Sequence, residues 1–206
     1  MFEQKDKTNI SSLGEFKLID HLTKSFTISK EETVLGIGDD AAIIESKGKH
    51  QLISTDMLIE NIHFDIMYSP LVHIGYKAIS SNISDICAMN ARATQVLVSI
   101  AISSKYTLEA IEELYVGMRA ACEKYDIQLI GGDTSSSVTG MVISITAIGY
   151  ADKKAIVQRS GAKEGDLICV SGDLGGAYMG LQLLEREKQV YLESKEMQPD
   201  LEEKII

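Results

Sequence analysis

The spacing of apolar residues constrains the fold of this chain most, because it changes between two periods along the sequence. Over residues 71–89 apolar side chains recur every three or four positions, which is typical of one face of a helix. Over residues 141–150 two sets of side chains alternate, as in a strand of a sheet: Ile143, Ile145 and Ala147 against Val142, Ser144, Thr146 and Ile148. The same patterns predict helices over 9–27, 71–89, 107–125 and 177–188, and strands over 33–44, 51–58, 94–103, 128–130, 141–150 and 166–171.

The order of these elements predicts the fold class. Two adjacent strands precede the first long helix and suggest a hairpin, after which strands and helices alternate. We therefore expect an α+β fold in which a layer of helices covers a mostly antiparallel sheet. Polarity rises at residues 151–154, so we place the first domain at 1–152 and the beginning of a second, incomplete α+β domain at 153–206. One strand and one helix cannot bury both faces of a sheet.

Composition excludes several classes of function. The net charge of -10 argues against nucleic-acid binding, which depends on contacts between basic residues and phosphates. No run of about 18 apolar residues could span a membrane, and the charged start lacks the apolar core of a secretory signal. The three cysteines lie far apart among apolar residues, so we expect buried free thiols and no disulfide or zinc framework. These features predict a cytoplasmic protein.

Four clusters of oxygen-bearing side chains follow apolar runs, each at the expected start of a turn. They are GDD at 38–40, STD at 54–56, SD at 84–85 and GGD at 131–133. Oxygen ligands from separate segments suit Mg²⁺, which also keeps waters and substrate phosphate oxygens in its shell. An acidic chain repels a polyphosphate unless divalent ions bridge the two. Together the clusters predict a magnesium-nucleotide site.

Each cluster by itself also has an ordinary structural explanation. The Asp-Asp and Ser-Thr-Asp segments could be caps or turns, and the GGD segment could be a hairpin turn. Asp85 is the strongest candidate, because a carboxylate on an otherwise apolar helix is rarely buried without a partner. His63 could be a packed or surface residue. Arg159 precedes a turn, where its planar guanidinium could clamp a phosphate.

Eight short motifs, in sequence order, resemble the thiamine-monophosphate kinase family, whose superfamily includes aminoimidazole-ribonucleotide synthetase. They are residues 14–19 (GEFKLI), 36–42 (GIGDDAA), 54–58 (STDML), 61–64 (NIHF), 76–78 (YKA), 82–89 (NISDICAM), 129–134 (LIGGDT) and 159–166 (RSGAKEGD). The chain lacks a GxxxxGK[ST] loop and the protein-kinase motifs, so its nucleotide chemistry must use a different fold.

The resemblance implies transfer of the γ-phosphoryl group of ATP to thiamine monophosphate, giving thiamine diphosphate and ADP. By this resemblance several Mg²⁺ ions would be held by Asp40, Ser54, Thr55, Asp56, Asp85 and Asp133. ATP would meet Gly132, Asp133 and Arg159, with Tyr115 a weaker candidate, and His63 would touch the thiamine phosphate. The acceptor is already an oxyanion, so no residue is expected to act as a strong base, and catalysis would consist of positioning and charge neutralisation. The resemblance also implies a homodimer formed through the N-terminal domain.

Two other functions stay open. The chain could be a magnesium-nucleotide-binding or assembly module without turnover, or a sister ATP-dependent synthetase. The sister synthetase would carry a DGVGTK-like stretch at 54–58, and selenophosphate synthetase would carry a reactive cysteine loop near its start; this chain has neither. The resembled family continues with a second half that carries an Asp-x-Ser-Asp-Gly stretch, which is absent here. We therefore expect the chain to hold about half of the active site.

Overall fold

The computed structural model describes residues 16–17, 23, 28–46 and 48–194. Its strands are β1 (Thr33–Leu35), β2 (Ala42–Ser46), β3 (Lys49–Ile59), β4 (Arg92–Ser103), β5 (Gln128–Ser137) and β6 (Val142–Ala151). Its helices over the described residues are α2 (Leu71–Ala88), α3 (Leu108–Tyr125) and α4 (Gly176–Ser194). None of these helices is both long enough and apolar enough to cross a membrane.

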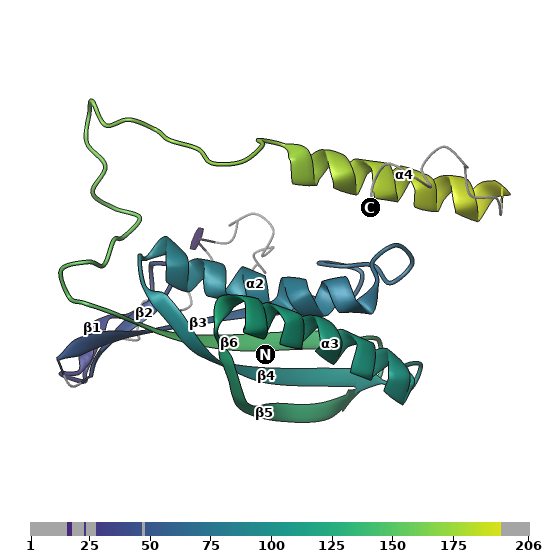
Figure 1. Cartoon of the computed structure of the whole chain (residues 1–206), viewed down its shortest axis with the longest axis horizontal. Helices are drawn as coiled ribbons and strands as arrows, with labels where there is room; N and C mark the ends of the chain where they lie inside the picture. The colour runs from purple at the N-terminus through teal and green to yellow at the C-terminus, as the bar shows by residue number, and fades with distance from the viewer. Residues whose placement is uncertain (1–15, 18–22, 24–27, 47, 195–206) are drawn as a thin grey trace, which may run out of the picture.

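The strands form one six-stranded sheet in the order β1-β2-β3-β6-β4-β5. Every neighbouring pair is antiparallel except β4 and β5, which are parallel. Parallel strands need a crossover connection, and α3 supplies it between β4 and β5. Helices α2 and α3 lie side by side over one face of the sheet (Figure 1). The predicted α+β fold with a mostly antiparallel sheet is confirmed.

The two faces of the sheet differ in burial. Along β6, the side chains of Ile143, Ile145 and Ala147 face the helices and are fully buried. Those of Val142, Ser144, Thr146 and Ile148 alternate with them and are half-buried on the opposite face, which no described helix covers (Figure 1). The predicted alternation over 141–150 is therefore confirmed, and it leaves one face of the sheet open.

Two single residues, Thr107 and Gly75, shape the helices through close contacts. The hydroxyl of Thr107 accepts a hydrogen bond from the amide of Ala110 at 3.2 Å, as expected of an N-cap. Helices α2 and α3 approach each other closely at Gly75, where an added Cβ would lie 1.9 Å from the backbone oxygen of Leu114. Only glycine fits that contact. The approach packs α2 closely against α3.

Several predicted elements are corrected by the structure. The strand predicted over 33–44 with a break at Gly36 and Gly38 is confirmed as two strands, β1 and β2. The strand expected over 128–130 is the ten-residue β5, so the GGD segment lies inside a strand and is not a turn. The STD segment lies inside β3, as the strand predicted over 51–58 implies. Of the helix expected over 9–27, Phe16, Lys17 and Thr23 are helical, and the rest lies outside the described residues.

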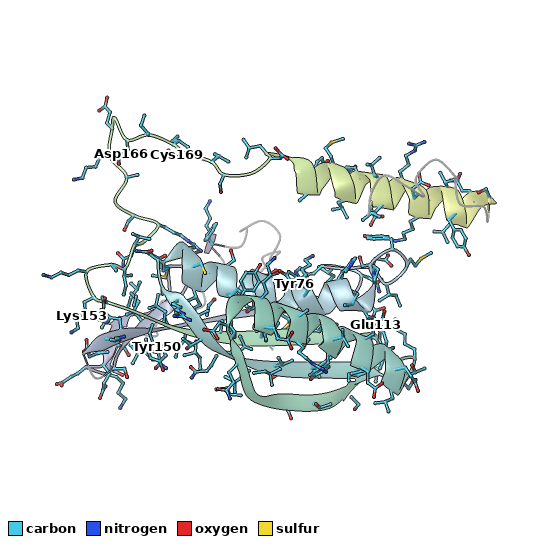
Figure 2. The ribbon with its side chains drawn as sticks, in the orientation of Figure 1. Tyr76, Glu113, Tyr150, Lys153, Asp166 and Cys169 are labelled. Carbon is cyan, nitrogen blue, oxygen red and sulfur yellow. The ribbon has the colours of Figure 1, made fainter. Side chains whose placement is uncertain are left out.

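The connection between β6 and α4 contains no strand among its described residues, so the strand predicted over 166–171 is wrong. Leu167 is 89% and Ile168 is 96% exposed, and no strand of the described residues lies beside them to pair with. Figure 2 shows the side chains of Asp166 and Cys169 on this connection, clear of the sheet and its helices. Cys87 is exposed too, so only Cys122 of the three thiols is buried as expected.

Helix α4 extends further than the predicted 177–188 and lies on the side of α2 away from the sheet (Figure 1). None of its residues is fully buried. Two polar contacts join it to the segment before α2: Lys188 donates to Asp65, and Tyr68 donates to Glu185. The domain boundary at residue 152, one residue after the end of β6, stays a prediction.

Candidate functional site

Ser54 and Asp85 meet between the sheet and α2. The hydroxyl of Ser54, on β3, donates to Oδ2 of Asp85, on α2, at 2.8 Å. Burial raises the pKa of Asp85, and the charges of Asp56 and Asp40 raise it further, against the opposing effects of Ser54 and Arg159. A raised pKa means that the surroundings disfavour the carboxylate form. A cation placed here would relieve that repulsion.

Arg159 joins the first acidic segment to the chain beyond the sheet. Its Nε donates to Oδ1 of Asp40 at 2.9 Å, and its Nη2 also bonds this oxygen. The backbone amide of Arg159 donates to Oδ2 of Asp39 at 3.4 Å. These bonds bring together residues 119 positions apart in the sequence. The guanidinium therefore stands beside the carboxylates, where it could also meet a phosphate.

Asp56 completes this group, whereas Thr55 does not belong to it. Side chains two residues apart on a strand share a face, so Asp56 lies on the same face of β3 as Ser54. It pairs with Ile145 of β6 and is exposed. The hydroxyl of Thr55 donates to the oxygen of Ile145 at 3.1 Å and lies 3.2 Å from that of Thr146, consistent with the opposite, open face. We call Asp40, Ser54, Asp56, Asp85 and Arg159 the acidic cluster.

Gly132 and Asp133 lie elsewhere, on the edge strand β5. Gly132 has a φ of 155°, and an added Cβ would lie 1.7 Å from the backbone oxygen of Val98, so only glycine fits. Asp133 is exposed and pairs with Ser99 of β4. Because β6 and β4 separate β5 from β3, Asp133 stands about 14 Å of strand spacing from the acidic cluster. One chain does not bring these predicted ligands together.

Tyr115 and His63 line two different cavities. Tyr115 contributes to a cavity of about 730 Å³ between α3 and the starts of β4 and β5, together with Arg92 and Arg119. His63 contributes to a cavity of about 860 Å³ between the segment after β3, the first turns of α2 and α4. Lys77 also lines this second cavity and was missed as a site residue, although it lies within the 76–78 motif. The predicted residues thus fall into four places: the acidic cluster, β5 and the two cavities.

The acidic cluster could supply only some of the ligands of a Mg²⁺ ion. Among the described residues, no three histidine, cysteine, aspartate or glutamate side chains converge where they could hold an ion. Mg²⁺ commonly takes one or two protein carboxylates and completes its shell with waters and substrate phosphates. The unbalanced negative charge around Asp85 suits that mode of binding. The assignment of Asp40, Ser54, Thr55, Asp56, Asp85 and Asp133 as metal ligands stays a prediction.

The chain is similar to known proteins over most of its length. The family described as AIR synthase related protein, N-terminal domain, matches residues 38–151. Thiamine-monophosphate kinase of Bacillus subtilis is 40% identical over 176 residues, which are 85% of this chain and 54% of that protein. Thiamine-monophosphate kinase of Aquifex aeolicus is 38% identical over 182 residues, which are 88% of this chain and 56% of that protein. The chain spans about half the length of these curated relatives.

Among solved structures, AaThiL complexed with AMPPCP and TMP superposes with a TM-score of 0.78 at 34% identity. The match covers 95% of this chain and 58% of that one. The family match spans β2 to β6, and therefore includes the segments that carry Asp40, Ser54, Asp85 and Gly132. This chain belongs to the AIR synthase related proteins, whose N-terminal domain it contains.

Proposed function

We propose that this chain binds magnesium-ATP and thiamine monophosphate as the N-terminal part of a thiamine-monophosphate kinase. The observation that carries the proposal is the acidic cluster, in which Ser54, Asp85, Asp40 and Arg159 converge from four segments. The proposal is also supported by the similarity of this chain to thiamine-monophosphate kinases. It is further supported by the similarity to AaThiL, whose structure contains TMP and AMPPCP, an ATP analogue. No nucleic acid or membrane takes part in this function.

In this proposal the protein positions two phosphates and neutralises their charge. Mg²⁺ ions, each held by one or two of the carboxylates of Asp40, Asp56 and Asp85, would neutralise charge on the transferring phosphoryl group. Arg159 would exchange one carboxylate partner for a phosphate oxygen, and Ser54 would keep Asp85 oriented. The backbone at Gly132 would approach ATP closely, and His63 would orient the acceptor phosphate. No strong base is needed, because the acceptor oxygen is already anionic.

We also propose a homodimer formed through the open face of the sheet. Met57 is 48% exposed, and Val142, Ile148 and Leu97 are half-buried on the face that no described helix covers. A second copy would remove these apolar side chains from water. It would also cover β5, an edge strand that carries Asp133. Light scattering over a range of protein concentrations tests this: a monomer at every concentration removes the dimer.

The test of the main proposal is calorimetric titration with magnesium-ATP, followed by an assay for thiamine diphosphate. Asp85→Asn keeps the shape of the side chain and removes its charge, so we expect Mg-ATP binding to weaken at least tenfold while the fold survives. Asp152→Asn changes an exposed carboxylate outside the cluster and serves as the control. Unchanged binding by Asp85→Asn would refute the metal assignment. Binding of Mg-ATP without any product would favour a module without turnover.

A further inference from the structure

The aromatic ring of Phe16 lies against Arg159 of the acidic cluster. Cζ of the guanidinium is 5.8 Å from the centroid of the ring, within the distance of about 6 Å over which a cation is attracted to an aromatic face. Phe16 belongs to the first of the eight sequence motifs, at residues 14–19, and it is 68% exposed. A side chain this exposed adds little to a hydrophobic core, so replacing it should not unfold the chain.

Phe16 and Asp40 hold the guanidinium of Arg159 by different forces. Nε and Nη2 both bond Oδ1 of Asp40 and therefore depend on an oxygen acceptor. The ring of Phe16 attracts the same cation through its π-face and offers no oxygen. A phosphate oxygen would compete with Asp40 for the N–H groups, because both are anionic acceptors. It would not compete with the ring.

The chain around Arg159 leaves its position to its own contacts. Every residue from 157 to 179 is exposed, so burial does not fix this stretch. The contacts that the structure shows for Arg159 are its backbone bond to Asp39, its side-chain bonds to Asp40 and the ring of Phe16. If a phosphate displaces Asp40, the ring is the side-chain contact that remains.

We infer that Phe16 is a positioning residue, whose ring keeps the guanidinium of Arg159 at the acidic cluster while a phosphate oxygen replaces a carboxylate oxygen. The inference rests on the proposed function only for the identity of this phosphate, that of magnesium-ATP. The contact itself follows from the geometry. The N-terminal segment that carries Phe16 thereby contributes to polyphosphate binding through Arg159 and without touching the ligand.

The first experiment detects the contact without any ligand. In the uniformly ¹⁵N-labelled chain, the spectrum of Arg159→Lys identifies the Nε–H signal of Arg159 among the four arginines. Because a proton over an aromatic face is shielded, Phe16→Leu should move the Hε signal of Arg159 to lower field, and Phe16→Tyr should restore it. Val138→Ala, at a fully exposed residue in the turn before β6, is the control and should leave the signal in place. An unmoved signal in Phe16→Leu overturns the inference.

The second experiment measures binding by calorimetry. In Phe16→Leu the Kd for magnesium-ATP and for magnesium-tripolyphosphate should rise about two- to fivefold, the effect of losing one cation–π contact at an exposed site. The Kd for adenosine, which carries no phosphate, should stay the same. Phe16→Tyr should restore the affinity, and Val138→Ala should not change it.

A double-mutant cycle shows whether Phe16 acts through Arg159. In the Arg159→Met background, Phe16→Leu should cause no further loss of affinity for magnesium-tripolyphosphate, because the cation that the ring holds is gone. A general structural role of Phe16 would cause the same loss with and without Arg159, and that result overturns the inference.

The outcomes separate this inference from the proposed function. If magnesium-ATP binds equally well to the parent and to Phe16→Leu, the positioning role is wrong while the proposed function stands. If magnesium-tripolyphosphate binds in a way that depends on both Phe16 and Arg159, but thiamine monophosphate does not bind, the positioning role stands and the proposed acceptor is wrong. If the parent binds no polyphosphate, the positioning role and the nucleotide part of the proposed function are both wrong.

Discussion

Glu60, at the end of β3, is the residue whose replacement should destabilise the N-terminal domain most clearly. Its side chain is 3% exposed, whereas that of its partner Lys105 is 44% exposed. One carboxylate oxygen bonds Lys105, and the other accepts from the hydroxyl of Tyr106 at 2.7 Å and from the amide of Met141 at 2.8 Å. These bonds fasten β3 to the segment before α3 and to the segment before β6. They also anchor the turn that carries His63.

The magnitude follows from what each substitution leaves behind. Glu60→Gln can keep its oxygen toward Tyr106 and Met141 but loses the charge, which makes hydrogen bonds to a charged group stronger by about 1 kcal/mol than neutral ones. Loss of the ion pair with the half-exposed Lys105 adds about 1 kcal/mol. We expect a cost of about 2 kcal/mol. Glu60→Ala leaves two buried donors without an acceptor and should cost about 4 kcal/mol.

The assay is urea unfolding of the whole chain, with the free energy taken from the midpoint and slope. Glu113→Gln is the matched control, because Glu113 is exposed on α3 and its side chain is visible at the surface in Figure 2. It should change the free energy of unfolding by less than about 0.5 kcal/mol. If Glu60→Gln costs no more than this control, the account of Glu60 as a buried anchor is wrong.

Three further predictions concern pH, the edge strand and a helix cap. Burial raises the pKa of Glu60, but the bonds from Lys105 and Tyr106 outweigh it, so this pKa lies below its ordinary value of 4.5. The stabilising contribution of Glu60 should therefore be present above pH 4.5 and disappear as the pH falls through its lowered folded-state pKa. In Glu60→Gln, the loss of stability that comes from protonating Glu60 should be missing. Gly132→Ala should lower stability by more than about 2 kcal/mol and weaken ATP binding, because the added Cβ would overlap the backbone oxygen of Val98. Thermal melts and calorimetry check this, and an unchanged melting temperature would contradict the contact. Thr107→Ala should cost about 1 kcal/mol in urea unfolding, through loss of the cap of α3, and Thr107→Ser should restore it.

The elements with a strong internal period could be predicted from the sequence. The strand alternation over 141–150 and the helical spacing over 71–89 are confirmed as β6 and α2, because each pattern records which side of one element faces the core. The N-cap of α3 at Thr107 is equally local, since its partner lies three residues away. The acidic segments were found as candidates in the same way, from residue types alone.

The tertiary structure decided which of these candidates meet. Ser54 reaches Asp85 across 31 residues and Arg159 reaches Asp40 across 119, and such contacts depend on how β3, α2 and the segment after β6 pack. Ser54 and Thr55 are adjacent in the sequence, yet Ser54 contacts Asp85 and Thr55 contacts the backbone of β6. The pleat of β3 turns their side chains to opposite faces.

Two other differences from the predicted elements, in β5 and over 166–171, also depend on segments distant in the chain. The GGD segment looks like a turn locally, yet pairing with β4 extends β5 through it. The apolar stretch over 166–171 looks like a strand locally, yet it forms none, because no described strand lies beside it to satisfy its backbone. Sequence by itself determines the period and chemistry of each segment of this protein. Partners distant in the chain decide whether a segment becomes a strand, which face a ligand takes and which ligands share a site.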